Sequence, residues 1–376
     1  MKILFTGGGT GGHFYPIIAV AEAINDEVRE RKLIEPQLYF ASVDPYDNEM
    51  LLANNITFVR TTAGKMRNYF SLLNFFDLFK TGWGVVRSML RVFFLYPDVV
   101  FGKGGYASFP TLLAAKLFRI PVVIHESDAE PGKVNRWAGT FATKIAVSYP
   151  DASVFFPKER VAYTGNPVRK AALVPSREGA HEFLHLKREL PILLVLGGSL
   201  GSQAINEVLL AALPQLLQKY QIVHQTGEQH IKEVEGRAKV VMGDSPLLER
   251  YKPYGYLNDL AMRMSAGVAN LVISRAGSTI FEIAGWGIPS IIIPIPEPVS
   301  HDQVKNAFAY ARAGGCSVIE QNNLTPGLLT SEVNHILENE ELKRKMSNAA
   351  RTFARADAAK LIANALLDIG LSHEEA

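Results

Sequence analysis

The sequence predicts an α/β protein made of two Rossmann-like, doubly wound domains that face each other across a cleft. Short apolar runs that read as buried parallel strands alternate with amphipathic segments. A glycine-rich turn follows an apolar run in each half, at residues 7–13 and 197–202. The stretch from 171 to 189 is charged and irregular, and the strand–glycine pattern restarts after it. A chain of 376 residues is long enough for two such domains.

Bulk composition excludes several classes of protein. Hydrophobic residues make up 48% and charged residues 20%, which is typical of a globular chain. The net charge of +2 is too small to indicate nucleic acid as a partner. A single cysteine, Cys316, excludes an intrachain disulfide. The sequence shows neither a secretory signal nor an apolar run of about 18 residues, so we expect a cytoplasmic location.

The first glycine-rich turn, Gly7 to His13, lies between the apolar run Ile3–Phe5 and a helix that we expect to open near Pro16. Glycine allows the backbone to approach a ligand closely, and the N–H groups at a helix start favour an anion such as phosphate. His13 is the only titratable side chain of this turn. The alternative is a tight structural turn with a capping histidine.

Two further segments of the first half carry candidate chemistry. A second glycine-rich turn, residues 102–108, follows the apolar run 98–101, and His125-Glu126-Ser127-Asp128 ends the strand 121–125. Ligands of open α/β sheets bind at the carboxyl ends of strands, so these groups predict a site, although a polar turn would also fit.

Residues 61–96 interleave basic and aromatic side chains, with Asp77 as the only acid. They are read either as helices with buried aromatics and solvated basic faces, or as a surface that rests on an anionic membrane. The candidate membrane patch is Lys65, Arg67, Tyr69, Phe70, Phe75, Phe76 and Phe79.

The second half repeats the strand–turn–helix pattern. Expected strands are 192–196, 221–225, 240–242, 254–256, 271–274 and 288–295. A helical tail begins near residue 331, and its Ala/Leu stripe from about 352 to 376 is expected to pack back on the first half. The domains are therefore expected at 1–168 and 169–351.

Known motifs narrow the chemistry. Gly7-x-Gly9-x-x-Gly12 matches a dinucleotide fingerprint. An NAD site also needs an acid about 20 residues later, at the end of the second strand, but the expected second strand, 37–41, ends without one and the next acid is Asp44. The sequence holds no Gly-Lys-Ser/Thr phosphate loop, no zinc spacing and no Asp-x-Asp pair. We therefore expect a diphosphate held by glycine loops and helix starts, with no metal and no obligatory cofactor. His13, Glu126 or Asp128 is the candidate general base for an acceptor hydroxyl.

Several of these segments together resemble the MurG-like glycosyltransferases. The resemblance runs from residue 1 to about 320 and is carried by Thr6–His13 with Pro16, 102–108, His125-Glu126, Gly165–Arg169, Gly197-Gly198-Ser199-x-Gly201, Ser274–Gly277, Glu282-Ile283-Ala284 and Gln303-x-x-Asn306.

This resemblance implies the two-domain GT-B fold and an inverting transfer of N-acetylglucosamine from UDP-N-acetylglucosamine. The implied acceptor is the 4-hydroxyl of N-acetylmuramate in undecaprenyl-diphosphoryl-muramyl-pentapeptide (lipid I), the product is lipid II, and the location is peripheral, on the cytoplasmic face of the membrane. The implied donor-binding residues are Thr10, Gly11, Gly12, Asp128, Arg169, Ser199, Leu257, Gly277, Ser278, Glu282, Asp302 and Gln303. The implied acceptor and diphosphate loops contain Gly9, Thr10, Gly104, Gly105 and Tyr106.

The sequence departs from the family's usual pattern in three ways. Asp128 replaces an asparagine, and Asp302 replaces a frequent glutamine. The stretch from Arg275 to Glu282 is one residue shorter than the commonest pattern. The alternatives are a related transferase with a diacylglycerol or natural-product acceptor, a non-catalytic nucleotide-sugar binding module, and an NAD-dependent oxidoreductase.

Overall fold

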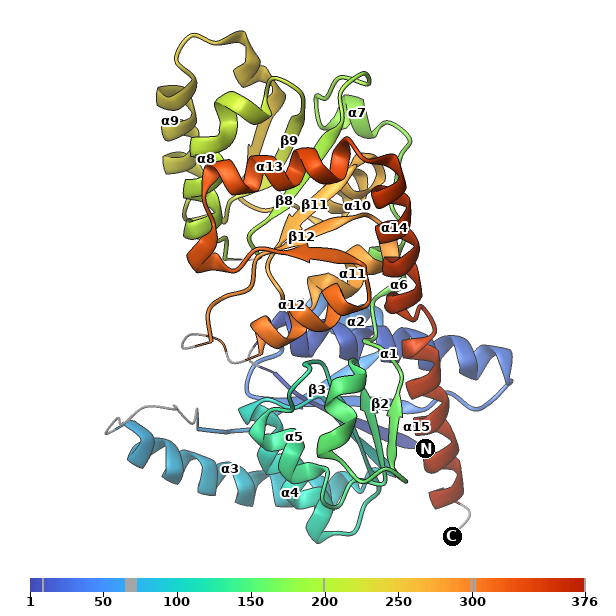
Figure 1. Cartoon of the computed structure of the whole chain (residues 1–376). Coiled ribbons are helices and arrows are strands. Elements are labelled where there is room, and N and C mark those ends of the chain that lie inside the picture. Colours follow the sequence, from blue (N-terminus) through green and yellow to red (C-terminus); the bar gives the residue numbers. More distant parts are fainter. Residues whose placement is uncertain (9, 65–72, 199, 298–299, 301, 375–376) are drawn as a thin grey trace. The chain divides into compact units, whose positions relative to one another are not determined.

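The computed structural model describes residues 1–8, 10–64, 73–198, 200–297, 300 and 302–374 (Figure 1). Internal contacts divide the chain into two compact units. The first unit comprises Met1–Arg169 together with Ala356–Ala376, and the second comprises Lys170–Arg355. The chain therefore passes between the units twice, at 169–170 and at 355–356.

The first unit is built on a parallel sheet of seven strands in the order β3-β2-β1-β4-β5-β6-β7. The strands are β1 (Lys2–Thr6), β2 (Gln37–Ser42), β3 (Ile56–Arg60), β4 (Val99–Gly102), β5 (Val122–Glu126), β6 (Lys144–Val147) and β7 (Val161–Tyr163). The helices are α1 (Gly11–Glu30), α2 (Asn48–Ala53), α3 (Leu73–Leu95), α4 (Phe109–Leu117), α5 (Lys133–Ala138) and α15 (Ala358–Glu374), with short 3₁₀ turns at Tyr106–Ser108 and Pro150–Phe155. The strand order reverses between β1 and β4, and a glycine loop follows each of these two strands. Ligands of doubly wound sheets bind at such a switch point.

The first helix begins earlier than the position of Pro16 predicts. Helix α1 starts at Gly11, with Thr10 as its N-cap residue, so Pro16 lies inside the helix. The proline lacks the N–H that would bond to the carbonyl of Gly12. The glycine-rich segment therefore contributes Gly11, Gly12 and His13 to the first helical turn.

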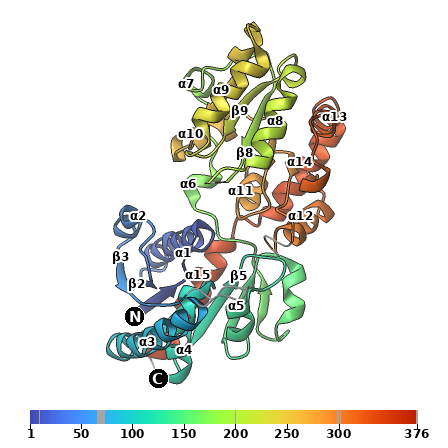
Figure 2. The same cartoon turned by 90° about the vertical axis from the view of Figure 1, so that its left-hand side faces the viewer.

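Helix α15 packs along α1 in the first unit, although the two helices lie at opposite ends of the sequence (Figures 1 and 2). Ile362, Ala363, Leu366 and Leu367 belong to the core cluster that also contains Ile17 and Ile24. Lys360 Nζ lies 2.8 Å from Glu27 Oε1, and Arg31 Nη2 lies 2.9 Å from Asp368 Oδ1. Arg355, in the left-handed conformation with φ of 45°, ends α14 before the chain enters α15.

The second unit repeats the architecture with six parallel strands in the order β10-β9-β8-β11-β12-β13. The strands are β8 (Ile192–Leu196), β9 (Gln221–Gln225), β10 (Tyr251–Tyr254), β11 (Leu271–Ser274), β12 (Ser290–Ile292) and β13 (Cys316–Val318). The helices are α6 (Lys170–Leu173), α7 (Ala180–Phe183), α8 (Gln203–Leu216), α9 (Ile231–Met242), α10 (Asp259–Val268), α11 (Thr279–Trp286), α12 (Gln303–Arg312), α13 (Pro326–Leu337) and α14 (Glu340–Ala354), with 3₁₀ turns at Pro246–Arg250 and Gln321–Asn323. Two parallel, doubly wound sheets confirm the predicted Rossmann-like fold class.

The prediction of a strand at residues 240–242 is wrong, because this segment forms the last turn of α9. Val234, Ala238 and Met242 are buried at a spacing of four residues, whereas Val240 is 84% exposed. That spacing is helical, and the β-branched pair Val240-Val241 misled the prediction because it lies on the exposed side. The neighbouring strand, β10, covers Tyr251–Tyr254 and ends two residues before the expected one.

No helix within the described ranges combines the length and apolar character needed to cross a lipid bilayer.

Candidate active site

The loop after β1 carries His13 into the first turn of α1. Thr10 is extended (φ −154°, ψ 159°), and its carbonyl accepts hydrogen bonds from the N–H groups of His13 and Phe14 at 3.1 and 3.2 Å. Thr10 Oγ1 lies 3.0 Å from His13 Nδ1. Gly9 lies outside the described residues. The loop thus holds the imidazole of His13 in place through a contact between Nδ1 and the hydroxyl of Thr10.

The second glycine loop lies directly against this histidine. Gly105 has φ of 78°, and a Cβ there would lie 2.9 Å from the carbonyl oxygen of Gly8 and 3.4 Å from His13 Cε1. Gly104 has φ of 83°, and its Cβ would lie 2.8 Å from Asn135 Nδ2. Tyr106 begins the 3₁₀ turn that follows. Only glycine allows this close approach of the two loops without strain.

Lys103, which the sequence analysis did not select, is the buried cation of this site. Its side chain is 1% exposed, and Nζ donates a hydrogen bond to Ser127 Oγ. Burial lowers the pKa of Lys103 to about 8, while the charges of Glu126 and Asp128 act in the opposite direction. Its position inside the glycine-rich segment Gly102-Lys103-Gly104-Gly105 was the only signal in the sequence.

Glu126 is buried, and its carboxylate accepts three hydrogen bonds. Oε1 accepts from the N–H of Asp128 at 3.0 Å, and Oε2 accepts from the N–H of Gly132 at 3.1 Å and from Asn135 Nδ2 at 3.0 Å. Burial raises the pKa of Glu126 to about 7, and the neighbouring charge of Asp128 adds to this rise. These contacts make Glu126 the anchor of the loop 127–132.

His125 faces the interior of the sheet. Its Nε2 lies 3.1 Å from the carbonyl oxygen of Gly165 and 3.2 Å from Ser148 Oγ, and the side chain is fully buried. Burial, reinforced by the charge of Lys103, holds the pKa of His125 well below its ordinary value. A neutral histidine in this setting links β5 to β6 and to the turn after β7.

His13 is also neutral at pH 7. Burial, followed by the positive charge of Lys103, lowers its pKa from 6.5 to about 4. The first unit therefore brings together His13, Lys103, Glu126 and Asp128 at the ends of β1, β4 and β5. This set combines a neutral imidazole, a buried ammonium and two carboxyl groups around two glycine loops.

In the second unit, Arg275 organises the corresponding edge of the sheet. It follows β11, and its Nη2 donates to Ser202 Oγ and to Gln321 Oε1, both at 2.7 Å, while Nη1 donates to the carbonyl of Ile293 at 3.0 Å. Burial lowers the pKa of Arg275 to about 10, so the guanidinium remains charged at neutral pH. A pocket of about 470 Å³ lies here, and its lining includes Arg275, Gly197, Gly201 and Ser202.

The predicted donor residues of the second unit lie at the carboxyl ends of its strands. Gln303 Oε1 accepts hydrogen bonds from the N–H groups of Ala276 and Ile295, at 3.3 and 3.1 Å. Gly277 and Ser278 precede α11, Glu282 lies in its first turn, and a Cβ at Gly277 would meet open space. Leu257 is buried and donates its N–H to Gln225 Oε1 at 3.0 Å.

The three remaining donor-binding residues predicted beyond the first glycine loop and Asp128 are Asp302, Ser199 and Arg169. Asp302 is the N-cap residue of α12, and Ser199 lies outside the described residues. Arg169 belongs to the first unit, where its guanidinium carbon lies 4.6 Å from the centre of the Tyr15 ring.

Lys65, Arg67, Tyr69 and Phe70 of the predicted membrane patch lie outside the described residues. Phe75, Phe76 and Phe79 belong to α3, whose later turns carry an exposed apolar face that the sequence analysis did not single out. The exposed residues of this face are Trp83 (66%), Val86 (48%), Leu90 (56%), Phe93 (56%) and Phe94 (79%). Their spacing of three or four residues places them on one side of the helix.

Among the residues with described coordinates, no group of three or more histidine, cysteine, aspartate or glutamate side chains could hold a metal ion.

The sequence matches two families of domains. Residues 3–147 match the "Glycosyltransferase family 28 N-terminal domain", and residues 192–362 match the "Glycosyltransferase family 28 C-terminal domain". Among solved structures, MurG of Acinetobacter baumannii superimposes with a TM-score of 0.74 at 27% identity, covering 98% of this chain and 99% of that one. A UDP-GlcNAc 2-epimerase from Neisseria meningitidis, with a TM-score of 0.68 at 15% identity over 98% of this chain and all of that one, shares the fold alone.

Named relatives match along nearly their whole length. The UDP-N-acetylglucosamine–N-acetylmuramyl-(pentapeptide) pyrophosphoryl-undecaprenol N-acetylglucosamine transferase of Treponema denticola is 34% identical over 398 residues, with 99% of both chains covered. Transferase 2 of the same name from Bacillus cereus is 35% identical, with 96% of this chain and 97% of the relative covered. The chain therefore belongs to the family of UDP-N-acetylglucosamine–N-acetylmuramyl-(pentapeptide) pyrophosphoryl-undecaprenol N-acetylglucosamine transferases.

Proposed function

We propose that this protein is an inverting hexosyltransferase that moves N-acetylglucosamine from UDP-N-acetylglucosamine to the 4-hydroxyl of the N-acetylmuramyl group of lipid I, producing lipid II for peptidoglycan. The observation that carries this proposal is the identity of 34–36% with transferases of this name over 90–99% of the chain. The two strand-end sites, one in each unit, are consistent with one substrate bound by each.

His13 is the proposed general base, because its ring is only partly buried and its lowered pKa keeps it neutral at pH 7. If Nδ1–H donates to Thr10 Oγ1, the neutral ring leaves Nε2 free to accept the proton of the acceptor hydroxyl. Glu126 is engaged by three donors on both oxygens, which suits a positioning role. Asp128 remains the second candidate, because it is only partly buried and its N–H is fixed by Glu126.

In the proposed donor site, the departing UDP diphosphate is stabilised by backbone N–H groups and Arg275. The N-terminus of α11, preceded by Gly277 and Ser278, offers N–H groups and a favourable dipole to an anion. Arg275 holds Ser202 near the start of α8, which is a second helix N-terminus. Glu282 is the proposed acceptor for the ribose hydroxyls. This arrangement provides charge stabilisation of the leaving group without an obligatory metal.

The exposed face of α3 is the proposed site of contact with the membrane that carries the lipid acceptor. Trp83, Phe93 and Phe94 are large apolar groups that lie mostly in solvent, while Arg87 and Arg91 occur on the same helix. Apolar and basic side chains together favour an anionic bilayer surface. The protein would then act as a peripheral enzyme on the cytoplasmic face of the cell membrane.

The proposal is tested by incubating the purified protein with UDP-N-acetylglucosamine and lipid I, and by following both UDP release and lipid II by mass spectrometry. UDP release must require both substrates. A diacylglycerol acceptor and a reaction without acceptor are run beside it. Turnover with diacylglycerol but not with lipid I would show that diacylglycerol, and not lipid I, is the acceptor. Binding of UDP-N-acetylglucosamine without turnover of any acceptor would show that the protein is a non-catalytic binding module.

The assignment of the base is tested separately with His13→Ala, which is expected to lower turnover by about 10²-fold or more while UDP-N-acetylglucosamine still binds. Asp128→Asn is the matched comparison. A near-normal rate in His13→Ala together with a large loss in Asp128→Asn would move the role to Asp128.

A further inference from the structure

The second unit holds another cavity, of about 640 Å³, at the opposite end of its sheet from the glycine loops. It is bordered by Asn270, which precedes β11, and by Pro289, which precedes β12. Arg275 and Ile295, which line the donor pocket, follow the same two strands. The length of each strand thus separates this cavity from the proposed donor site.

The charged residues that line the cavity are almost all basic. They are Arg177, Lys343, Arg344 and Arg351, with Glu340 as the only acid. Glu340 Oε1 lies 2.5 Å from Lys343 Nζ, which leaves an excess of positive charge on the three arginines. Within the part of the chain that the structure describes, no carboxylate forms an ion pair with Arg177, Arg344 or Arg351.

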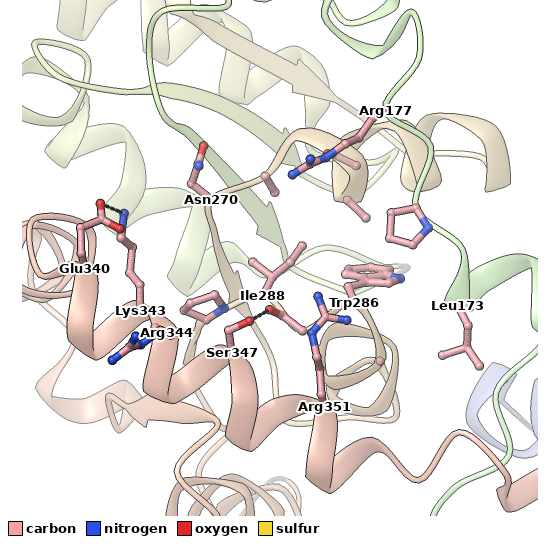
Figure 3. Close-up of a pocket in the computed structure, with 17 residues that line it drawn as sticks. Leu173, Arg177, Asn270, Trp286, Ile288, Glu340, Lys343, Arg344, Ser347 and Arg351 are labelled. Carbon is pink, nitrogen blue, oxygen red and sulfur yellow. Dashed lines mark hydrogen bonds and ion pairs between the residues drawn. The ribbon is translucent and has the colours of Figure 1, made fainter.

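These cations line one cavity, and Figure 3 shows that Arg177 and Arg351 extend toward it from different sides. Glu340, Lys343, Arg344, Ser347 and Arg351 recur at three- and four-residue spacing and so form one face of α14. Arg177 approaches from the opposite side, fixed by a 2.9 Å hydrogen bond from Nε to the carbonyl of Gly267, so that its two terminal nitrogens stay available.

Arg351 is held in place by the end of α11. Gly287, the C-cap residue of that helix, has φ of 68°, and a Cβ there would lie 2.5 Å from Arg351 Nε and Cζ. Ser347 Oγ donates to the carbonyl of Gly287 at 2.6 Å. The arginine side chain therefore lies against the backbone of Gly287, and Trp286 and Ile288 also line the cavity.

We infer that this cavity is a second, anion-binding site, and that its ligand is a phosphate-bearing group with at least two negative charges. Guanidinium groups bind phosphate through paired, charge-assisted hydrogen bonds, and several cations around one space favour a multiply charged ligand over a single carboxylate. Free pyrophosphate or a nucleotide polyphosphate and an anionic phospholipid headgroup share this chemistry. The inference does not depend on which acceptor the enzyme uses.

The test measures pyrophosphate binding by titration calorimetry on the whole protein saturated with UDP, which blocks the proposed donor site. A parallel arm measures sedimentation with phosphatidylglycerol vesicles. The variant is Arg177→Glu with Arg344→Glu. The matched control is Lys232→Glu with Lys239→Glu, which makes the same change of charge at exposed positions of α9 in the same unit.

We expect the arginine variant to weaken binding in one of the two arms by at least about tenfold, because two charge-assisted contacts are lost, while the control binds as the unaltered protein does. A loss confined to pyrophosphate identifies a soluble ligand, and a loss confined to vesicles identifies a headgroup. Retained UDP affinity and an unchanged circular dichroism spectrum verify that the variant is folded. Equal binding by variant and control in both arms, or no binding in either, would overturn the inference.

Discussion

Replacement of Lys103 by methionine gives the sharpest test of the first unit's electrostatics. Methionine has nearly the same length as lysine and removes the buried charge, which acts on both His13 and Glu126, together with the hydrogen bond to Ser127. The Lys103 charge disfavours the imidazolium form, so its loss raises the pKa of His13 from about 4 toward the ordinary 6.5. The acid limb of the kcat/KM profile, which reports the base in the free enzyme, must therefore move to higher pH.

The size of this shift follows from Coulomb's law. At an effective dielectric constant of about 20, two unit charges about 4 Å apart interact by about 4 kcal/mol, and the interaction falls in inverse proportion to their distance. Lys103 is the second cause of the lowered pKa of His13, after burial. His13 is partly exposed, so solvent screening reduces the effect of the Lys103 charge to a displacement of roughly one pH unit. The variant should thus lose activity more steeply than the unaltered enzyme between about pH 4 and pH 6, while the two rates converge near pH 8.

The assay is UDP release at limiting lipid I from pH 4 to pH 9, with Lys144→Met, an exposed lysine of the same unit, as the matched control. Stability gives an independent readout. The folded protein holds the pKa of Lys103 at about 8, below its ordinary 10.5, so the unfolded chain binds more protons in that window and wild-type stability rises with pH across it. The variant should lack this increase of stability with pH, and its melting temperature at pH 7 should be no lower than that of the unaltered protein. An unchanged acid limb in a folded variant would refute the coupling of Lys103 to the catalytic base.

Three further predictions concern other parts of the molecule. Arg275→Lys keeps the charge but cannot make the three hydrogen bonds to Ser202, Gln321 and Ile293, so the Kd for UDP measured by calorimetry should rise about tenfold, and an unchanged Kd would contradict the role of Arg275. Gly105→Ala forces a side chain into φ of 78° against Gly8 and His13, so thermal stability and kcat should both fall, whereas Gly132→Ala, in open space, should change neither. Trp83→Glu with Phe94→Glu should reduce binding to anionic vesicles at least tenfold, and Val240→Glu, an exposed apolar position of α9, is the control; equal binding would leave α3 without a membrane role.

The fold was predictable because it depends on patterns that a single sequence displays. Apolar runs such as Ile3–Phe5 and Ile192–Leu196 are short, β-rich and bounded by glycine, and both became fully buried strands. Errors arose where a residue's local preference opposed its context. Pro16 suggested a helix start, but the helix begins earlier, at Gly11, directly after the extended Thr10. Val240 and Val241 favour a strand by preference, but they occupy the exposed side of a helix whose buried side determines its position.

Sequence alone selected candidate site residues only where they stand in recognisable motifs. His13, Glu126 and Gly277 were each adjacent to a glycine loop or a strand end, where ligands of this fold bind. Arg275 was not selected as a site residue, although it directly follows β11. The sequence analysis named residues 61–96 as a possible membrane surface but could not say which of their side chains are exposed, because sequence alone does not reveal which side of an apolar helix packs inward. Val92 is buried, while Phe93 and Phe94 next to it are exposed.

Lys103 was missed for a different reason, and that reason bears on how the site works. A lysine between glycines reads as a solvated loop residue, since burial of an ammonium group is costly. Here the ends of β1, β4 and β5 enclose it together with Glu126 and Asp128, two carboxyl groups separated from it by more than 20 residues in the sequence. The ammonium offsets part of the repulsion between those carboxyl groups and at the same time disfavours a proton on His13. One buried charge thereby lowers the pKa of the proposed base and of its neighbouring carboxyl group together, so that a change at Lys103 must alter both, in the same direction.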